Sequence, residues 1–477
     1  MKKHYINGQW TEPKSGQSLE AIDPSTGKVF DHIARGTQAD VDLAVAAARA
    51  ALDGPWGRTS ALERGRILMR MNQAVHAHLD ELARLEAQDT GKPLSTARND
   101  ILVLARYFEF YGTAVDKIHG NVIPFDAGYN ALLLREPLGV TAHIIPWNYP
   151  AQMVGRSVAP ALAMGNAVVL KPSEDACMTP LRIAELSAEC GIPPGVFNVV
   201  TGLGEEAGAA LSGHPGIDFV TFTGSNEVGA LVQAAAAQNA VKVALELGGK
   251  SPQIVFADAD MDRAVPVIIK AIAQNAGQTC AAGSRLLVER SVYDSFVERV
   301  AHAFGKIRVG TSEMDRDCGP LINDTQRKRV LGYIDQARRD GIPVLSEAAL
   351  EPSLPDEGFY VTPTMFGSVP PEHPLAQEEV FGPVLAVTPF DDESEAVRIA
   401  NGTAYGLVAA VWSENGARQM RVAKSLKSGQ VFINCYGAGG GVELPFGGVK
   451  RSGHGREKGL LALEEMSSAK TILQFHG

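Results

Sequence analysis

The regular alternation of apolar strands and helical segments over residues 140–245 constrains the fold of this chain more than any other feature. The strands are expected at residues 140–145, 167–170, 196–200, 219–222 and 241–245, with helices between them at 151–164, 179–190, 205–211 and 227–238. Successive β-α-β connections are right-handed and build a parallel sheet with helices on both faces. The sequence therefore predicts a doubly wound, Rossmann-like α/β domain with its ligand at the carboxyl ends of the strands.

A second α/β series follows from about residue 252 to 450, after Gly248-Gly-Lys-Ser251, which forms a candidate hinge. Its strands are expected at residues 253–256, 285–288, 384–390, 409–412 and 430–434. Upstream of the first series, residues 5–36 have the pattern of short strands and turns. Three helices are expected after them, at residues 41–52 with Asp40 as the cap, at 60–90 and at 99–116.

Residues 118–137 interrupt the helical pattern with two extended runs around Phe125-Asp-Ala-Gly128. This arrangement predicts a β-hairpin with a four-residue turn. A strand pair between helices needs a sheet to join, so we expect an extension of the domain or an oligomer contact here. The tail, residues 469–475, is an isolated β-like segment, expected either as an edge strand of its own domain or as a strand paired with a neighbouring subunit.

Charge and cysteine content exclude several classes of protein. The 477-residue chain has a formal net charge of −10, which argues against non-specific binding to nucleic acid or to an anionic membrane. Its cysteines are scattered and odd in number, so neither a metal site nor a disulfide framework is indicated, and a reducing, cytoplasmic location is expected. No apolar run is long enough for a membrane span, and no apolar stretch follows the N-terminal lysines as in a secretory signal. The cysteines are Cys177, Cys190, Cys280, Cys318 and Cys435.

Two residues, Cys280 and Glu246, have the chemistry that a covalent mechanism needs. Cys280 lies among small residues and glycines, and Glu246 ends a β-rich run before two glycines. An ionised thiol is a strong nucleophile, and a carboxylate beside an acyl-thiol can activate the water that hydrolyses it. Taken alone, Cys280 is more typical of a small buried apolar residue, and Glu246 of a charge at the end of a strand.

Polar residues follow the first two parallel strands directly, at the edge where ligands bind. Asn148, within Pro146-Trp-Asn-Tyr-Pro150, offers a neutral amide donor suited to an oxyanion. Lys171 and Glu174, within Lys171-Pro-Ser-Glu174, are suited to the hydroxyls of a ribose. The alternative interpretations are a rigid proline turn for the first motif and a surface loop for the second.

Glycine-rich turns lie at two later strand-to-helix junctions, Gly202–Gly208 and Phe222–Ser225. Backbone amides and a helix N-terminus there are suited to a pyrophosphate, although the first turn has one residue more than the dinucleotide fingerprint. The lysine of a P-loop is missing, so a nucleotide triphosphatase is not indicated. Further along, Glu378–Val384 supplies a carboxylate and an aromatic ring before a strand, and Pro445–Gly455 is a glycine-dense loop.

Taken in order, these motifs resemble those of the NAD(P)-dependent aldehyde dehydrogenase superfamily, of the hydrolytic type that does not acylate coenzyme A. The resemblance extends from Tyr5 to the final strand. It implies an NAD-binding domain (residues 1–117 and 138–248), a catalytic α/β domain (249–448) and a small β oligomerisation element (118–137 and 449–477). It also implies a homodimer or homotetramer with a small-molecule aldehyde as the substrate.

The resemblance also implies a role for each matching residue. Cys280 would attack the aldehyde, Asn148 and the Cys280 amide would hold the oxyanion, and Glu246 would activate water to release a carboxylic acid. NAD would be preferred over NADP because Glu174 would repel a 2′-phosphate. The residues expected to contact the cofactor are Ile145, Pro146, Trp147, Lys171, Ser173, Glu174, Gly204, Gly208, Phe222, Thr223, Gly224, Ser225, Leu247, Glu379 and Phe381.

The sequence departs from the family pattern at Ser157, where many relatives have a lysine, so a proton-relay role at that position is in doubt. The preceding residue, Arg156, is expected with Met153 on the helix that lines the substrate tunnel. A similar arginine in succinic semialdehyde dehydrogenases suggests a carboxylated substrate, and a similar run in benzaldehyde-type enzymes suggests an aromatic aldehyde. The alternative for Arg156 is an ion pair with a structural carboxylate, or a bond to a backbone carbonyl.

Two other functions are compatible with this fold. A relative that acylates coenzyme A would pass the thioester to a thiol, but such relatives typically lack the base that Glu246 provides. A non-catalytic binding or structural protein would not need Cys280, Glu246 and Asn148 together. Both alternatives are therefore less well supported than a hydrolytic dehydrogenase.

Overall fold

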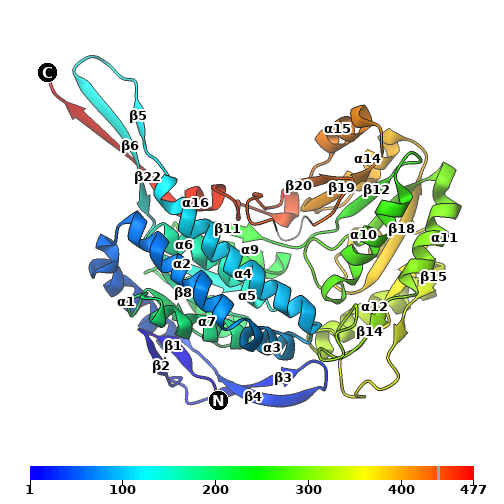
Figure 1. Ribbon diagram of the computed structural model, residues 1–477, viewed down its shortest axis with the longest axis horizontal. Coiled ribbons are helices and arrows are strands. Elements are labelled where there is room, and N and C mark those ends of the chain that lie inside the picture. The colour runs from blue at the N-terminus through cyan, green and yellow to red at the C-terminus, as the bar shows by residue number, and fades with distance from the viewer. Residues whose placement is uncertain (438–440) are drawn as a thin grey trace.

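The computed structural model describes residues 1–437 and 441–477, and residues 438–440 of the expected catalytic domain lie outside the described part. Figure 1 shows two α/β lobes side by side and a β arm that projects from the first lobe. Each lobe is built around its own mainly parallel sheet with its own buried apolar core. Within the described residues, no helix combines the length and apolarity needed to cross a membrane.

The first sheet confirms the predicted doubly wound arrangement. Five parallel strands lie in the order β9-β8-β7-β10-β11, with β1 and β2 antiparallel at one edge and β21 at the other. Every residue of β7 and β8 is buried, as expected for strands covered by helices on both faces. The bounds are β1 His4–Ile6, β2 Gln9–Thr11, β7 Val140–Ile145, β8 Ala167–Pro172, β9 Phe197–Val199, β10 Phe219–Thr223, β11 Lys242–Glu246 and β21 Gly453–His454.

The helices of the first lobe depart from the sequence-based bounds in several places. The expected helix at 60–90 is broken at His78, which ends α2 and begins α3, and α4 starts at Leu94 rather than at residue 99. Gly91 ends α3 in the left-handed conformation, with φ of 73°. The bounds are α1 Gln38–Asp53, α2 Ala61–Ala77, α3 Leu79–Thr90, α4 Leu94–Ala114, α5 Pro150–Met153, α6 Ala159–Ala163, α7 Met178–Glu189, α8 Ala209–Ser212 and α9 Asn226–Ala237.

Helix α1 also begins earlier than predicted, at Gln38, so Asp40 is the third residue of the helix and not its cap. The Asp40 carboxylate accepts a hydrogen bond from the backbone amide of Thr37 at 2.9 Å. An acidic residue at this position completes a capping box with Thr37. Asp40 therefore stabilises the first turn from inside the helix.

The second lobe has a seven-stranded sheet in the order β15-β17-β18-β13-β12-β19-β20, parallel except for β15. All five predicted strands are present, whereas β15 and β17 were not predicted. Their signals are weak because β17 has three residues and β15 is a largely exposed edge strand. The bounds are β12 Pro252–Val255, β13 Arg285–Glu289, β15 Val344–Glu347, β17 Thr364–Phe366, β18 Val384–Phe390, β19 Val408–Trp412 and β20 Gln430–Ile433.

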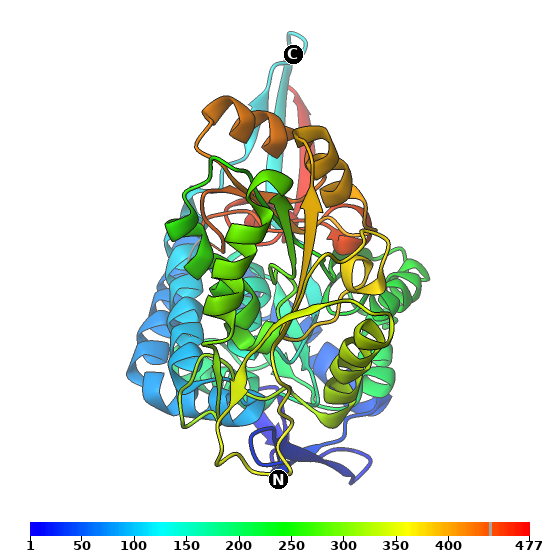
Figure 2. The same ribbon diagram turned by 90° about the vertical axis from the view of Figure 1, so that its right-hand side faces the viewer.

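Helices cover this second sheet, and the edge of the lobe with β18 and α11 faces the viewer in Figure 2. The helices are α10 Met261–Ala273, α11 Tyr293–Phe304, α12 Asp324–Arg339, α13 Pro374–Gln377, α14 Glu393–Asn401 and α15 Gly416–Ser425. Smaller elements are the antiparallel pair β3 Ser18–Asp23 and β4 Lys28–Ala34 and the short pair β14 Arg308–Val309 and β16 Ala349–Leu350.

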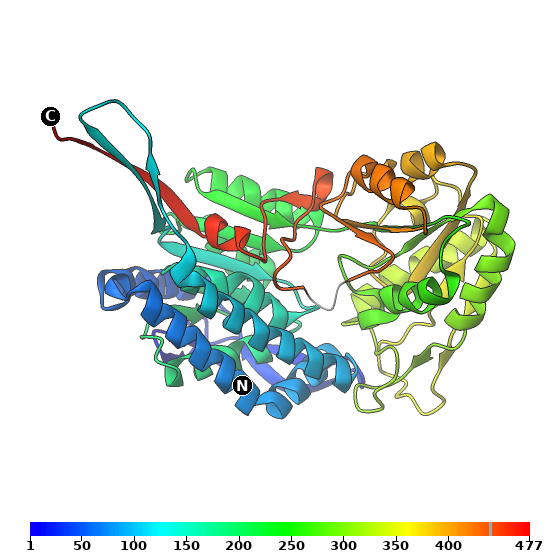
Figure 3. The same cartoon turned by 45° about the horizontal axis from the view of Figure 1, so that its top comes forward.

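The predicted hairpin forms the arm, and the C-terminal tail pairs with it. Strand β6 (Tyr129–Pro137) lies between β5 (Asn121–Ile123) and β22 (Ser467–Phe475), antiparallel to both. The tail therefore pairs within its own chain. Figure 3 shows the C-terminal segment passing over the first lobe, through β21 and α16 (Leu461–Glu465), before it enters the arm.

Candidate active site

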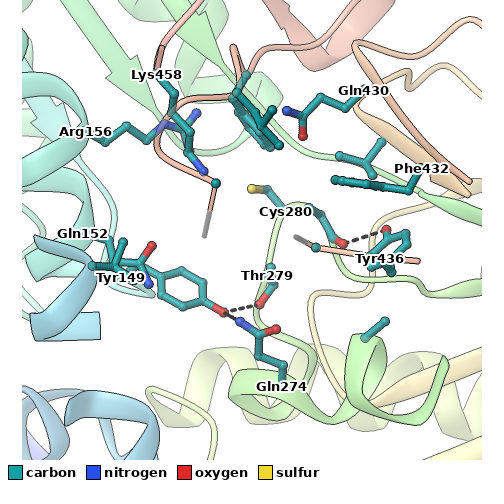
Figure 4. A pocket seen from close by; sticks show the side chains of 18 of the residues that line it. Tyr149, Gln152, Arg156, Gln274, Thr279, Cys280, Gln430, Phe432, Tyr436 and Lys458 are labelled. Atoms are coloured by element: carbon teal, nitrogen blue, oxygen red, sulfur yellow. Dashed lines mark hydrogen bonds between the residues drawn. The ribbon is translucent and has the colours of Figure 1, made fainter. Parts of the chain in front are cut away.

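Cys280 lies in the short loop between a tight turn at Gln274–Gly277 and β13, where it is half-buried. Both of its neighbours are tied to the walls of a cavity, as the dashed lines in Figure 4 show. The Thr279 hydroxyl bonds to the Tyr149 hydroxyl at 2.8 Å, and Tyr436 donates to the Ala281 carbonyl at 2.8 Å. These bonds hold the thiol of Cys280 towards the cavity.

The cavity has a volume of about 370 Å³ and is lined by residues of both lobes. Its described lining includes cations but no aspartate or glutamate. The cations are Arg156, Lys270 and Lys458, and four aromatic rings complete the walls: Tyr149, Phe432, Tyr436 and Phe446. Met153 lines the same cavity, as predicted for a substrate-facing residue.

Burial raises the pKa of the Cys280 thiol to about 11, and the nearby Arg156 and Lys458 oppose that rise. The reactive form of a cysteine is the thiolate. The two cations therefore favour the reactive form in surroundings that otherwise disfavour it.

Asn148 follows β7 at the carboxyl edge of the first sheet and is buried. Its side-chain amide donates to the Gln278 carbonyl at 2.9 Å, two residues before Cys280. Its main-chain carbonyl accepts hydrogen bonds from the Asn275 side chain at 3.0 Å and from Lys92 Nζ at 3.0 Å. The bonds with Gln278 and Asn275 tie Asn148 to the cysteine loop, while Lys92 holds it from its own lobe.

Lys92 is a buried support of this contact that the sequence analysis did not identify. Its ammonium lies 2.6 Å from Asp100 and 3.3 Å from Glu86, and all three side chains are buried. Buried charges are retained when they are paired and hydrogen-bonded. The only signal in the sequence is the lysine of Gly91-Lys-Pro93, directly after the helix expected at residues 60–90.

Glu246 ends β11, where it lies between Thr223 of β10 and Gly453 of β21. The side chain is buried, and neither carboxylate oxygen has a hydrogen-bond partner among the described residues. Burial raises its pKa well above the ordinary value, while the charge of Arg156 opposes the rise. A buried carboxylate with free lone pairs is suited to accept a proton from water.

Arg156 occupies a π-helical turn (Val154–Val158) between α5 and α6, in the segment predicted as a single helix. Its Nη2 lies 3.2 Å from Glu246 Oε2, and its Nε contacts Glu457. The guanidinium also stacks over the Phe446 ring, with 4.3 Å to the centroid. Arg156 therefore combines the two expected arrangements, since it lines the cavity and is ion-paired with carboxylates.

The neighbouring Ser157 donates its hydroxyl to the Met153 carbonyl at 2.9 Å within the same helical segment. Its bond is therefore local, unlike the contacts of Arg156.

Glu457 and Lys458 are further site residues that the sequence analysis missed, just beyond the glycine-dense loop. The Lys458 ammonium lies over the Phe446 ring, and burial lowers its pKa to about 8.

The residues expected to contact a cofactor in the first lobe gather at the carboxyl ends of its parallel strands. Lys171 Nζ bonds to Glu174 Oε2 at 2.8 Å after β8, and Ser225 caps α9 by accepting from Val228 N. The others follow or end neighbouring strands: Ile145, Pro146 and Trp147 at β7, Ser173 at β8, Gly204 and Gly208 after β9, Phe222, Thr223 and Gly224 at β10, and Leu247 after β11.

Glu379 and Phe381 approach this edge from the second lobe. Phe381 makes an edge-to-face contact with Trp147, with 5.4 Å between the centroids. Glu379 accepts a hydrogen bond from the Gly249 amide at 2.9 Å, and burial raises its pKa to about 7. A Cβ at Gly249 would lie 2.4 Å from the Cys280 carbonyl oxygen, so only glycine permits this approach.

This edge has the features that a dinucleotide requires. The N-terminus of α9, a helix of 12 residues, carries a partial positive charge suited to a pyrophosphate. Apart from the adjoining backbone, no atom of the described residues lies within 4 Å of the position that a Cβ would occupy at Gly204, so this backbone is open to a close approach. The residues present therefore fit NAD.

The comparisons with known proteins agree with this geometry. The profile of the "Aldehyde dehydrogenase family" matches residues 10–472. The chain is 43% identical to "Aldehyde dehydrogenase 1" of Tanacetum cinerariifolium, over 98% of this chain and 94% of that one. A crystal structure from Burkholderia cenocepacia is 60% identical, with both chains fully covered and a TM-score of 0.99. The betaine aldehyde dehydrogenase of Staphylococcus aureus, solved with NAD⁺, is 36% identical over 100% and 95% of the two chains, with a TM-score of 0.97.

The fold and site thus define an oxidoreductase that acts on aldehydes. The chain belongs to the aldehyde dehydrogenase family, as the resemblance of its motifs indicated.

Proposed function

We propose that the protein is an NAD-dependent, hydrolytic aldehyde dehydrogenase that forms its acid product through a thioester on Cys280. The observation that carries the proposal is that Cys280 lines the cavity and that Glu246 lies 3.2 Å from Arg156, which lines the same cavity. The buried Glu246 is near enough that its charge raises the pKa of the thiol. Glu246 also has two oxygens without hydrogen-bond partners among the described residues.

In the first half of the proposed reaction, the Cys280 thiolate attacks the aldehyde carbon and forms a thiohemiacetal. The negative charge on the former carbonyl oxygen is stabilised by the Asn148 side chain and the Cys280 amide. The hydrogen bonds from Lys92 and Asn275 to the Asn148 carbonyl keep this donor in place. NAD, when bound, accepts the hydride that leaves the thiohemiacetal carbon.

In the second half, Glu246 takes a proton from water, and the water oxygen bonds to the thioester carbon. The C–S bond breaks, the carboxylic acid leaves, and Cys280 is released as the thiolate. The intact carboxylate of Glu246 favours this route over transfer of the acyl group to coenzyme A. The cofactor would be held by the residues at the strand ends of the first lobe, with Glu379 and Phe381 on the opposite side.

The lining of the cavity supports two classes of aldehyde. Lys270 and Lys458, with no carboxylate among the described lining residues, favour an aldehyde that carries a carboxylate. The aromatic walls favour an aromatic aldehyde as the second class. Two carboxylates already match the charge of Arg156, so we do not propose it as the receptor of a substrate carboxylate.

We also propose the three-domain division given above, with the arm as the contact of a homodimer or homotetramer. Exposed apolar side chains on the arm support the contact, including Val122, Leu473 and Phe475. Strand β21 lies in the first sheet, so within residues 449–477 it is β22 that joins the arm.

The five free thiols support a reducing, cytoplasmic location.

The direct test is formation of NADH with a panel of neutral, aromatic and carboxylated aldehydes, followed by mass spectrometry of the products. The proposal requires NADH and a free carboxylic acid in equal amounts without added coenzyme A. NADH formation that depends on coenzyme A would favour the acylating alternative. No NADH with any aldehyde would favour a non-catalytic role.

A further inference from the structure

Arg156 lies between two buried carboxylates at the wall of the cavity. Its Nη2 is 3.2 Å from Glu246 Oε2, and its Nε contacts Glu457 Oε2. At most 5% of any of these three side chains is exposed. Charges this deeply buried interact strongly, because little water screens them.

Glu457 is held from several directions. Its Oε1 accepts a hydrogen bond from Thr221 Oγ1 at 3.0 Å. Its backbone pairs in both directions with Phe446, at 2.7 and 2.8 Å, and the Phe446 ring packs against the guanidinium of Arg156. Glu457 and Phe446 are therefore fixed in place, and both contact the guanidinium group of Arg156.

Glu246 is held much less firmly. Neither of its oxygens has a hydrogen-bond partner among the described residues, and the polar contact of its carboxylate is the ion pair with Arg156 at 3.2 Å. Glu457 and Phe446 thus fix the position of Arg156, and Arg156 in turn determines where the Glu246 carboxylate lies. Because the Oε atoms make no geometrically complete hydrogen bond, their lone pairs stay available for a water.

We propose that Arg156 is a positioning residue for thioester hydrolysis, which holds Glu246 in place as an anion instead of receiving the carboxylate of the substrate. The inference rests on the proposed function, since it assigns Arg156 to the step that Glu246 performs. Arg156 does not itself transfer the proton, because a guanidinium stays charged at all relevant pH values.

The charges around Glu246 support this role. Burial raises the pKa of Glu246, Glu457 raises it further, and Arg156 is the strongest of the groups that lower it. Arg456 and Lys458, on the C-terminal loop, also lower it, but less than Arg156. Loss of Arg156 therefore leaves Glu246 more often protonated near neutral pH, when it cannot accept a proton from water.

The test uses two variants of the full-length enzyme. Arg156→Lys keeps the charge but replaces a planar fork by a point charge that cannot bridge both carboxylates as well. The double variant Arg156→Met/Glu457→Gln removes one charge of each sign, so the buried net charge is unchanged while Glu246 loses its cation. Ser157→Ala is the control on the same helical turn, because the Ser157 hydroxyl bonds only to the Met153 carbonyl in the described structure.

An opposite charge in contact shifts the pKa of a carboxyl group by about one to three units. In the double variant the loss of Glu457 lowers the pKa of Glu246 and so offsets part of the rise caused by the loss of Arg156. We therefore expect the acid limb of the kcat profile to move up by at most about one to three pH units, with kcat at neutral pH lower by at most roughly 10- to 1000-fold. Arg156→Lys should restore part of the loss, and Ser157→Ala should match the wild type. Mass spectrometry of the intact protein should show acyl-enzyme accumulating in the double variant.

Other outcomes have distinct meanings. Unchanged kcat profiles and no accumulation of acyl-enzyme would overturn the inference. A KM that rises only for carboxylated aldehydes, with kcat unchanged, would also overturn it and make Arg156 a substrate receptor. If the double variant does not fold, Arg156→Lys alone tests the inference. The measured quantity is then the shift of the acid limb of the kcat profile in that single variant. A wild-type enzyme that forms no acyl-enzyme would instead contradict the proposed function.

Discussion

The ammonium of Lys171 donates a hydrogen bond to Glu174 Oε2 across 2.8 Å at the carboxyl end of β8. The Lys171 side chain is almost completely buried, whereas about a third of the Glu174 side chain is exposed. The carboxylate therefore matches the lysine charge on the side where the adenosine ribose is proposed to lie. The pair offers hydrogen bonds to hydroxyls but little net positive charge to a phosphate.

We therefore expect a higher kcat/KM with NAD than with NADP. Two like unit charges about 4 Å apart repel by about 1 to 4 kcal/mol between water and the protein surface, which corresponds to a factor of at least about five. Glu174→Gln keeps the shape and removes the charge, so it should narrow the ratio by raising kcat/KM for NADP. Equal efficiency of the wild type with both cofactors would contradict this role of Glu174.

Cys280→Ala should abolish aldehyde oxidation, because covalent catalysis needs the thiolate. NAD should still bind with a dissociation constant close to that of the wild type, since its proposed contacts lie at the strand ends of the first lobe. Steady-state NADH formation and calorimetric titration with NAD measure the two properties. Cys435→Ala is the control, because Cys435 is exposed and does not line the cavity among its described residues. Turnover of Cys280→Ala within tenfold of the wild type would rule out the nucleophile.

Glu246→Gln should slow hydrolysis of the thioester more than its formation. A neutral amide cannot take a proton from water, although its shape is nearly the same. The first turnover should still release NADH as a burst, while steady-state turnover falls by roughly 10²–10⁴, the usual contribution of a general base. Stopped-flow absorbance separates the two phases, and the absence of a burst would place Glu246 in an earlier step.

Lys458 should give carboxylated aldehydes a pH dependence that neutral aldehydes lack. Burial lowers the pKa of Lys458 to about 8, so the ammonium is present below that pH and is lost as the pH rises through it. The KM of a carboxylated aldehyde should therefore rise across pH 8, whereas that of a neutral aldehyde of equal length should not. A charged hydrogen bond contributes about 1.5–3 kcal/mol, so Lys458→Met should raise the KM of the carboxylated aldehyde roughly 10- to 150-fold.

An unchanged ratio of the two KM values in Lys458→Met would exclude a carboxylate site at this lysine. Lys270→Met is a useful comparison, because Lys270 lines the same cavity from α10 but lies on an exposed position. If its effect is the larger one, the carboxylate is bound at the mouth of the cavity.

The arm should hold the subunits together. Leu473 and Phe475 point to one side of β22 and are 51% and 67% exposed, although Phe475 packs against Tyr129 within the arm. Large apolar side chains exposed to this extent are typical of a surface that another subunit covers. Leu473→Asp/Phe475→Asp should lower the molar mass measured by light scattering to that of a smaller assembly. Gln474→Asp, whose side chain lies on the other side of the strand, should leave the assembly intact. An unchanged mass in the double variant would place the subunit contact elsewhere.

Local patterns in the sequence predicted the parallel strands well, because a strand covered on both faces is an uninterrupted apolar run such as Val140–Ile145. They predicted the position of Asn148 for the same reason, since a residue that follows such a strand lies at the ligand-binding edge. Marginal elements were not predictable in this way. The break at His78 interrupts an otherwise helical pattern, and the exposed edge strand β15 lacks an apolar face.

The sequence by itself determined the main strands and helices and, through motifs at the strand ends, the family, and it predicted Cys280, Glu246 and Asn148 as the site residues. Only the tertiary structure decided which charges meet. Arg156 and Glu246 are 90 residues apart in the chain, and Glu457 lies a further 211 residues away, yet all three side chains share one buried site. Local patterns report burial and backbone geometry, whereas an ion pair between distant segments depends on how the β11 edge, the π-helical turn and the C-terminal loop pack together.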